Sequence, residues 1–540
     1  MWRTLRGAEW GAALFLTVLI VCLHLMAATS AGALWRDEAN TVAIATLPRV
    51  ADVWKNLQYD SFPILWLLIL RGYASLVGPM NDPAFRALGC LIGVAITGAL
   101  WFNARTFRHS LPLLSLAMFG MSPSMIRWGD TMRAYGFGIL LILVTCALLW
   151  RFIDKPGVGR FAATAVLAIA SVNVLYYNAV LLFAFCAGGV AVCVYRRTWK
   201  NAAYVMLIGF LAAISLVPYL ATIRGAGAWN MLVRIPNYDF HWFWTKLGET
   251  LQPAGGGSLL AWACLASAAV VYGTIAVIFP RWLKISDDRR EIALFALVTL
   301  LVGTTGIFAF LRALSYYTQP WYYLTLLAVT AVSVDTLFGA VIQARAVRIS
   351  RVAAALLIGA AAILPGSRLV RQRLTDIDIV AAKVNSLAKP GDVILVSPWQ
   401  YGVTFSRYYR GTNDWVTVPA VAWHRFHRYD QLGEVMRMAD QDLPARQVTD
   451  RAGEALRSGH RVFVVGALQG RHGNWKAMAL SSPSSASVWS ESVHEQHWEA
   501  LVSQFLTQRA RTRTLVPLNV PQIVSWYEIA WLQMFDGWRP

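Results

Sequence analysis

Charged residues are scarce in this chain. They make up 14% of its 540 residues, whereas hydrophobic residues make up 57%. This balance excludes an ordinary soluble globular domain and is typical of polytopic membrane proteins. Cysteine is also rare: all six cysteines lie inside apolar runs, so they indicate no disulfide framework. No glycine-rich dinucleotide fingerprint and no phosphate-binding P-loop occurs in the sequence, which argues against nucleotide binding.

The net charge of +19 does not indicate a nucleic-acid partner. Most of the basic excess lies in residues 1–368, in short loops between apolar runs. Lys and Arg in such loops set the orientation of membrane helices. We therefore predict that the chain contacts membrane lipids and binds no nucleic acid.

Eleven apolar runs are long enough, or nearly long enough, to cross a membrane. They are residues 11–31, 84–105, 111–126, 134–152, 160–176, 178–195, 201–222, 258–280, 291–311, 320–338 and 351–367. A further run, residues 63–79, is short and carries Arg71 in its middle. The basic loops, such as RRTWK and RWLKISDDRRE, share one side only if this run does not cross. We therefore predict a re-entrant or interfacial segment at 63–79, a cytoplasmic N-terminus and an external C-terminus, in a bacterial-type inner membrane.

On this topology the main polar segments of the membrane region face the outside. They are residues 32–83, 123–133 and 223–257. Most carboxylates of residues 1–368 lie in these segments: Asp37, Glu38, Asp52, Asp60, Asp82, Asp130, Asp239 and Glu249. Because acidic residues do not set topology, their grouping independently indicates that the chemistry takes place on the external face.

Residues 369–540 form a polar region that is long enough for one domain. A predicted helix at 376–388 precedes an apolar strand at 390–398, and a second helix at 450–459 precedes a strand at 460–467. This alternation predicts an α/β domain with an at least partly parallel sheet. The expected organisation is thus a membrane domain at 1–368 and a soluble extracytoplasmic domain at 369–540.

Polar motifs follow one another in a definite order along the external segments. An Asp–Glu pair (Asp37, Glu38) comes first, then YDSFP with Asp60, then SPSMIRWGDTMRAYGFG with Asp130, Arg133 and Tyr135, and finally LRALSYYTQPWYY with Arg312 and Tyr316. This ordered set resembles the GT-C superfamily of membrane glycosyltransferases, in particular the protein O-mannosyltransferases and the lipid A aminoarabinose transferases. The resemblance covers roughly residues 1–340, and more loosely the C-terminal region.

The resemblance implies an inverting enzyme of the cell envelope that takes a sugar from a polyprenyl-phosphate donor. The acceptor would be a hydroxyl of a lipid, a glycan or a protein. Asp37 would then be the general base, and Glu38 and Asp130 would be further acidic positions of the catalytic site. Asp60 would belong to an element near the acceptor.

The chemistry of such a transfer agrees with a single base. A polyprenyl phosphate leaves as an anion, so it needs cationic stabilisation rather than a general acid. The acceptor hydroxyl does need a base. Candidates for contacts to the donor phosphate are Arg133 and Arg312 with Tyr135, and more weakly Arg224, Arg234 and Lys246, because Arg suits bidentate contacts to oxyanions. Tyr316 is a candidate for the acceptor side.

Each candidate also has a simpler structural interpretation. Asp37 would cap the helix that follows it, Asp130 would pair with Arg133, and the arginines would anchor the membrane interface. Asp37 and Asp130 are also candidates for holding a divalent cation, although no cofactor is otherwise indicated. His427 is expected at the surface, because HRFH lacks the grouping of a metal site.

Two other classes of protein remain open at this point. A transporter or flippase would carry its ionisable residues at mid-membrane and contain inverted repeats, neither of which the sequence shows. A polysaccharide polymerase or ligase would share the external arginines, and the Asp–Glu pair favours the transferase over it. The sequence predicts neither the sugar, hexose or pentose, nor the acceptor.

Overall fold

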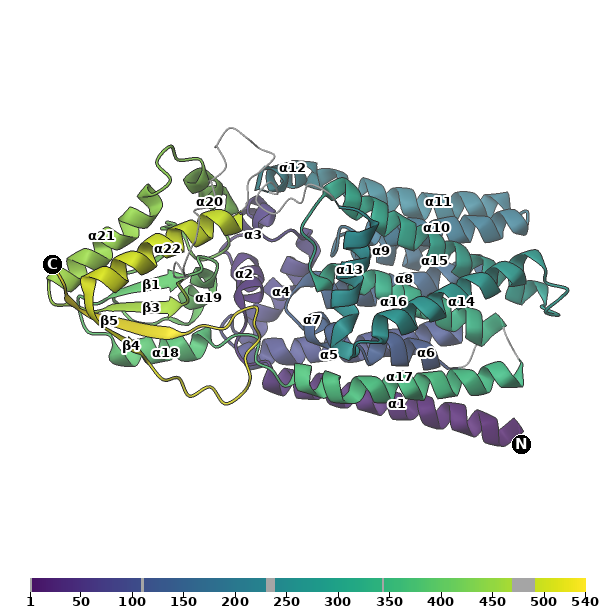
Figure 1. The fold of residues 1–540 in the computed structure, drawn as a ribbon. Coiled ribbons are helices and arrows are strands. Elements are labelled where there is room, and N and C mark those ends of the chain that lie inside the picture. Colours follow the sequence, from purple (N-terminus) through teal and green to yellow (C-terminus); the bar gives the residue numbers. More distant parts are fainter. Residues whose placement is uncertain (1, 108–110, 230–237, 342–343, 469–490) are drawn as a thin grey trace.

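The computed structural model describes residues 2–107, 111–229, 238–341, 344–468 and 491–540. Part of the predicted loop 223–257, including Arg234, therefore lies outside the described residues. Figure 1 shows two parts: a long bundle of helices, and a mixed helix–sheet domain at one end of it. Short helices lie where the bundle meets this domain, among them α2 (Arg36–Ala45), α3 (Val50–Lys55) and α4 (Ile64–Val77).

Within the described residues, nine helical segments are long and apolar enough to cross a membrane, and the chain is a multi-pass membrane protein. The helices that supply them are α1 (Trp2–Ser30), α5 (Asp82–Thr106), α8 (Ala134–Asp154), α10 (Asn178–Tyr195), α11 (Trp199–Ile214) continued by α12 (Leu220–Trp229), α14 (Ser258–Ile278), α15 (Asp287–Leu314), α16 (Leu324–Thr336) preceded by η6 (Pro320–Tyr323), and α17 (Arg345–Val370).

Two of the segments expected to cross have a different form. The run at 160–176 becomes α9 (Val158–Val172), which has only 15 residues. The run at 111–126 is divided into α6 (Leu113–Ser115), a π-helical turn η2 (Leu116–Gly120) and α7 (Pro123–Gly129). Pro123 at the first position of α7 cannot donate a backbone hydrogen bond, so it starts a new helix there. The number of eleven crossings stays a prediction.

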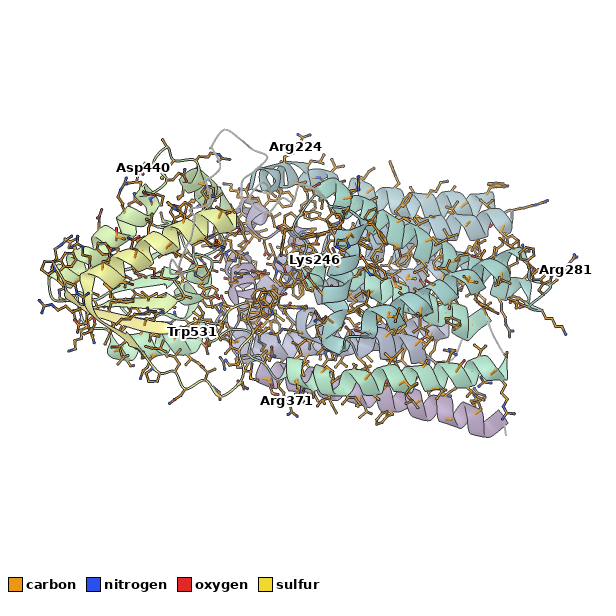
Figure 2. The ribbon with its side chains drawn as sticks, viewed as in Figure 1. Arg224, Lys246, Arg281, Arg371, Asp440 and Trp531 are labelled. Carbon is orange, nitrogen blue, oxygen red and sulfur yellow. The ribbon has the colours of Figure 1, made fainter. Side chains whose placement is uncertain are left out.

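The two ends of the bundle carry different segments of the chain. The N-terminus and Arg281, which belongs to a predicted cytoplasmic loop, lie at the end of the bundle remote from the sheet (Figures 1 and 2). Helix α4 lies at the opposite end, beside α2, and its failure to cross the membrane stays a prediction. Arg71, in the middle of α4, donates hydrogen bonds to the carbonyls of Leu47, Pro48 (2.7 Å) and Ala45 (3.3 Å). These carbonyls at the end of α2 explain an arginine inside an apolar run.

The C-terminal domain contains a five-stranded sheet with the order β2-β1-β3-β5-β4. Its strands are β1 (Val393–Ser397), β2 (Trp415–Thr417), β3 (Val462–Gly466), β4 (Ala510–Leu515) and β5 (Leu532–Trp538). Strand β1 is parallel to both β2 and β3, whereas β5 is antiparallel to β3 and β4. The predicted α/β domain with a partly parallel sheet is confirmed.

Helices cover both faces of this sheet. Along β1, Leu395 packs in one cluster with α21 (Leu443–Arg457) and α22 (Glu491–Arg509), while Ile394 and Val396 pack in another with α18 (Ile377–Leu387) and α19 (Tyr401–Tyr408). Successive side chains of a strand point to opposite faces, so β1 is apolar throughout. A further helix, α20 (Tyr429–Met436), follows the loop at 424–428.

The segment 123–133, predicted to face the outside, is not an exposed loop: every residue in it is buried. Helix α7 and the turn after it pack into the bundle, against α5. Glycine permits this close approach, because a Cβ at Gly89 would lie 1.9 Å from the carbonyl oxygen of Asp130. Hydropathy does not predict this burial, because two charged residues, Arg127 in α7 and Asp130 directly after it, make the segment look exposed.

Helix α13 (Phe240–Leu251) continues into the turn η5 (Gln252–Ala254). It begins with Asp239 as its N-cap, whose carboxylate accepts a hydrogen bond from the backbone N–H of Trp242 at 2.8 Å. Figure 1 shows α13 beside the bundle, near the junction with the sheet domain.

Candidate active site

Asp37 lies at the second position of α2, where the helix bundle meets the C-terminal domain. The prediction that it caps this helix is wrong. Trp35 is the N-cap residue, and its backbone N–H donates to Glu38 at 3.3 Å in a capping box. The side chain of Asp37 is therefore free of a capping role, and it is 20% exposed.

Three basic or imidazole groups surround the Asp37 carboxylate. Its Oδ1 is 3.6 Å from Arg36 Nε and 3.6 Å from His427 Nε2. Burial opposes its ionisation, but His427 and the charges of Arg133 and Arg36 outweigh burial and lower the pKa of Asp37 to about 2. Asp37 is thus an ionised carboxylate with partial access to solvent.

Arg133 is fixed beside Asp37 by a buried polar group. Its Nη1 donates to the Asp60 carboxylate, to Thr41 Oγ1 at 2.7 Å and to the Asp37 carbonyl at 3.2 Å. Burial opposes the positive charge, but Asp60 outweighs it and raises the pKa of Arg133. Asp60 also accepts a hydrogen bond from Asn40 at 3.1 Å and is 2% exposed. Asp60 therefore contacts Arg133 rather than an acceptor.

Glu38 does not face the site. It is fully buried, and its carboxylate accepts hydrogen bonds from Arg86 (2.6 and 2.9 Å) and from the backbone N–H of Met132 (2.8 Å). The prediction of Glu38 as a catalytic side chain finds no support in this geometry. Its ion pair instead ties α2 to α5 and to the turn that precedes Arg133.

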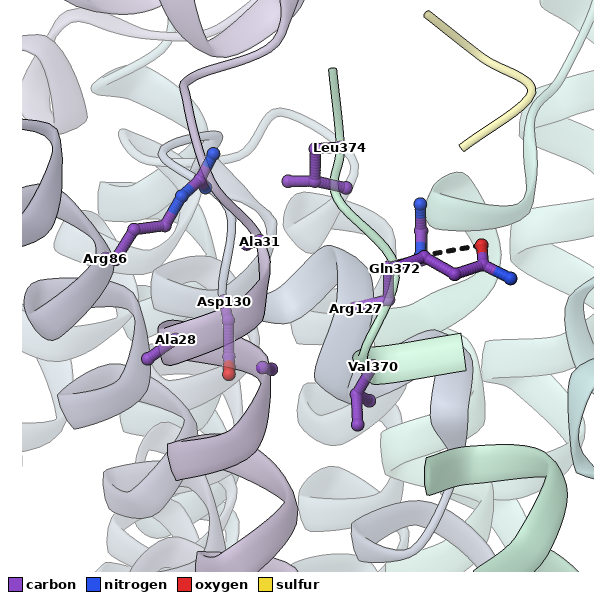
Figure 3. A pocket seen from close by; sticks show the side chains of 9 residues that line it. Ala28, Ala31, Arg86, Arg127, Asp130, Val370, Gln372 and Leu374 are labelled. Carbon is purple, nitrogen blue, oxygen red and sulfur yellow. Dashed lines mark hydrogen bonds between the residues drawn. The ribbon is translucent and has the colours of Figure 1, made fainter. Parts of the chain in front are cut away.

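Asp130 also turns away from Asp37. Its carboxylate contacts Nδ1 of His24, on α1, at 2.8 and 3.0 Å, so the alternative prediction of an Asp130–Arg133 pair is wrong. A Cβ at Gly93 would lie 2.3 Å from His24 and 2.4 Å from Asp130, so only glycine leaves room for this pair. Figure 3 shows Asp130 and Arg86 on the wall of a small cavity that Arg127 also lines.

A cavity rich in basic residues, which we name the cationic cavity, opens next to Arg36. It has a volume of about 940 Å³. Its charged lining residues are Arg36, Arg127, Lys246, Arg368 and Glu249. Four positive side chains thus face one negative one, so the cavity is suited to an anion.

Arg127 is one of two buried cations of this cavity, with 7% exposure, and Lys246 is the other. Its Nη1 donates to the Leu369 carbonyl (2.9 Å) and to Gln372 Oε1 (3.4 Å, the dashed line in Figure 3), and its Nη2 has no hydrogen-bond partner among the described residues. Burial lowers the pKa of Arg127 to about 10. Lys246, in contrast, pairs with Glu249 at 2.7 Å. Arg127 therefore has donor capacity left for a ligand.

A second cavity, which we name the tyrosine cavity, has a volume of about 220 Å³ and is mostly apolar. Five tyrosines supply most of its hydroxyl groups: Tyr135, Tyr176, Tyr177, Tyr316 and Tyr322. Tyr322 also interacts electrostatically with both Arg133 and Asp37. Asp37 itself lines neither cavity, but a neighbour of it lines each one: Arg36, 3.6 Å away, lines the cationic cavity, and Tyr322 lines the tyrosine cavity.

Two predicted phosphate ligands lie elsewhere. Arg224 is exposed on α12 and points outward, well separated from Lys246 in Figure 2. Arg312 is exposed at the end of α15 and approaches only the Tyr238 carbonyl, at 3.5 Å. The geometry therefore supports neither arginine as a phosphate ligand. It brings Asp37, Arg133, Tyr135 and Tyr316 to one region, as predicted.

Sequence reasoning missed four residues of this region: His24, Arg86, Arg127 and His427. The prediction of His427 at the surface is wrong, since the side chain is buried against Asp37. The available signal for Arg86 and His24 was an ionisable side chain inside an apolar run. Arg127 lies within the motif that contains Asp130, but the motif alone indicated no role for it.

The carboxylates expected to share a divalent cation do not form such a site. Asp37 and Asp130 contact different partners, Arg36 and His24. Among the described residues, no group of three or more His, Cys, Asp or Glu side chains could hold a metal ion.

The fold is similar to solved membrane-protein structures. ArnT from Cupriavidus metallidurans in the apo state matches with a TM-score of 0.50 and 12% identity, over 85% of this chain and 93% of that chain. ArnT from the same organism bound to undecaprenyl phosphate matches with a TM-score of 0.49 and 12% identity, over 84% and 93%. The apo oligosaccharyltransferase from Archaeoglobus fulgidus matches with a TM-score of 0.48 and 10% identity, over 85% and 70%. No protein-family model matches the chain, and no curated protein matches it.

The chain has the GT-C fold. The resemblance predicted from the ordered motifs is thereby confirmed at the level of the fold. Because the match to apo ArnT covers 85% of this chain, it extends beyond the helix bundle into the C-terminal domain. Within this fold, Asp37 lies on the first helix after α1, at the junction of the helix bundle and the C-terminal domain.

Proposed function

We propose that the protein transfers a sugar from a polyprenyl-phosphate donor to an acceptor hydroxyl, with Asp37 as the general base. The observation that carries this proposal is one ionised, partly exposed carboxylate whose neighbours Arg36 and Tyr322 line a cationic cavity and a tyrosine-lined cavity. A group transfer needs two substrates that meet at one catalytic group, and this arrangement provides for both.

The cationic cavity is suited to the donor phosphate. Arg36 and Arg127 would contact the phosphate oxygens, and Lys246 and Arg368 would add positive charge as the phosphate leaves. This assignment replaces Arg224 and Arg312 with residues that line the cavity beside Asp37. Arg133 contributes indirectly, because its charge helps to hold Asp37 ionised.

The reaction then needs no general acid. The acceptor oxygen attacks C1 of the sugar, the bond between C1 and the phosphate oxygen breaks, and the acceptor proton passes to Asp37. The phosphate departs with its electron pair as an anion that the cationic cavity stabilises. Direct displacement of this kind inverts the configuration at C1.

The tyrosine cavity is the proposed path of the acceptor. Its apolar walls and its hydroxyl groups, including those of Tyr135, Tyr316 and Tyr322, suit an amphiphilic molecule. The acceptor remains a lipid, a glycan or a protein hydroxyl, and the sugar remains a hexose or a pentose. Residues 1–368 would carry the catalysis, and residues 369–540 would lie on the extracytoplasmic side of a bacterial-type inner membrane.

Phosphate binding can be tested without knowing the acceptor. Purified protein in nanodiscs is titrated with undecaprenyl phosphate and with undecaprenol, which lacks the phosphate. We expect the phosphate to bind at least about tenfold more tightly, and Arg127→Gln to remove most of this preference. Arg281→Gln, at the opposite end of the molecule, is the control. Equal affinities for the two lipids would contradict the proposed donor site.

Turnover is tested with a panel of radiolabelled polyprenyl-phosphate sugars and a cell-envelope lipid and glycan extract as acceptor. Label should move to the acceptor with at least one donor, and Asp37→Asn should abolish the movement. Asp52→Asn removes a carboxylate of the same segment that is 24% exposed, similar to Asp37, and should leave activity unchanged. Folded protein that transfers no label, but moves labelled lipid across vesicles, would instead support a flippase.

A further inference from the structure

The C-terminal domain places a histidine directly on the Asp37 carboxylate. His427 comes from the loop before α20, nearly four hundred residues after Asp37, and is 3% exposed. Its Nε2 is 3.6 Å from Asp37 Oδ1. Among the described residues, neither ring nitrogen has a hydrogen-bond partner at shorter range. A buried imidazole without another partner is costly unless it interacts with the carboxylate beside it.

Contacts from the membrane domain hold this loop in place. The backbone N–H of His427 donates to Asn40 Oδ1 at 2.7 Å, and the Asn40 amide in turn donates to Asp60 at 3.1 Å. On the other side of the loop, the Tyr59 hydroxyl donates to Asp430 at 3.0 Å. The same α2 helix that carries Asp37 thus fixes the backbone of His427.

Aromatic rings fix the imidazole plane. Trp399 meets the ring edge-on with centroids 5.8 Å apart, and Tyr429 lies at 5.6 Å. Both belong to the C-terminal domain. The ring therefore has little freedom to turn away from Asp37.

We propose that His427 is the positioning residue for the general base: its Nε2–H donates to Asp37 Oδ1 and directs the other carboxylate oxygen toward the acceptor hydroxyl. This inference rests on the proposed function of Asp37. It makes the C-terminal domain a part of the active site, because the helix bundle alone would leave Asp37 without this donor.

The surrounding charges favour the neutral form of the imidazole. The charged groups that face His427 are Asp37, Arg36 and Arg133. Burial, together with the two arginines, outweighs Asp37 and lowers the pKa of His427. A neutral imidazole has one N–H, and the nitrogen nearest the carboxylate carries it. During transfer the acceptor proton passes to Oδ2 of Asp37 while Oδ1 keeps its hydrogen bond, so His427 acts without touching substrate.

Activity assays distinguish this role from a purely structural one. His427→Phe should lower kcat by about 100-fold, the size expected when one positioned donor is lost, and leave KM within about twofold. His427→Gln retains an N–H donor and should recover to within about tenfold of the wild type. The control is His424→Gln, three residues away, which removes a half-buried histidine that stacks on Trp415.

Several results would overturn the proposal. They are an unchanged kcat in His427→Phe, a rise in KM alone, or equal losses in the Gln and Phe variants. If His427→Phe does not fold, judged by its thermal unfolding, the kcat and KM of His427→Gln decide in its place. A KM effect without a kcat effect would make His427 an acceptor ligand.

A titration independent of turnover keeps this inference separate from the proposed function. The imidazole pKa of His427 is measured by NMR on protein with labelled histidine, in the wild type and in Asp37→Asn. Loss of the carboxylate should lower the pKa by about one pH unit, because a nearby negative charge favours the imidazolium. An unchanged pKa overturns the inference. A shift in a protein that transfers no sugar would contradict the proposed function and leave the contact standing.

Discussion

Glu38 and Asp37 are adjacent carboxylates, and the structure predicts opposite consequences for their amide variants. Glu38→Gln removes the charge that pairs with Arg86, a side chain that is only 5% exposed. The arginine would then be buried without its counter-ion. Breaking a buried ion pair in this way costs about 3–5 kcal/mol of folding free energy. We therefore expect a clear loss of thermal stability in Glu38→Gln.

Asp37→Asn should behave in the reverse manner. Asp37 is partly exposed and 3.6 Å from Arg36, and the shift of its pKa to about 2 corresponds to a cost of about 2–3 kcal/mol for the amide, less than for the fully buried Glu38–Arg86 pair. The amide cannot accept the acceptor proton, so kcat should fall by about 100-fold or more.

Thermal unfolding in detergent and steady-state transfer of the labelled sugar measure the two effects on the same preparations. The unfolding temperature of Glu38→Gln should fall while its remaining folded fraction turns over, and that of Asp37→Asn should fall less while its folded protein does not turn over. A Glu38→Gln variant with wild-type stability and no turnover would refute the assignment of a structural role to Glu38.

Three further predictions follow from the site. Gly93→Ala should destabilise the fold by about 1–3 kcal/mol in chemical unfolding, because its methyl group would overlap the His24–Asp130 pair, whereas Gly98→Ala on the same helix meets nothing within 4 Å and should be neutral or stabilising. Arg127→Gln should raise the KM for the donor in steady-state assays with little change in kcat, and Arg281→Gln should change neither. The pKa of Asp37 is lowered to about 2, so its ionised carboxylate stabilises the fold above its pKa in the unfolded chain, about 3.9, and this stabilisation is lost as the pH falls toward 2. For the same reason, kcat/KM should show no change due to titration of Asp37 between about pH 5 and pH 8.

The sequence was sufficient for the features that depend on local pattern. Long apolar runs predicted a multi-pass membrane protein, and nine helical segments among the described residues are long and apolar enough to cross. Alternating helices and apolar strands predicted the α/β domain. The ordered polar motifs predicted the GT-C fold, and they included Asp37, Arg133 and Tyr135.

The features that escaped prediction depend on contacts between distant segments. Arg86 meets Glu38 across 48 residues and His24 meets Asp130 across 106, and no spacing rule connects such pairs. The burial of α7 depends on the absence of a side chain at Gly89, a condition that concerns shape rather than hydropathy. The burial of His427 could not be predicted from the sequence, because its contact with Asp37 depends on how the C-terminal domain docks on the helix bundle.

The stereochemistry of transfer tests the central claim most directly. With the active donor identified, the anomeric configuration of the sugar is determined by proton NMR in the donor and in the first-formed product. Direct displacement by an acceptor that Asp37 deprotonates predicts inversion at C1. Retention would require a covalent intermediate on a second nucleophile and would contradict the account.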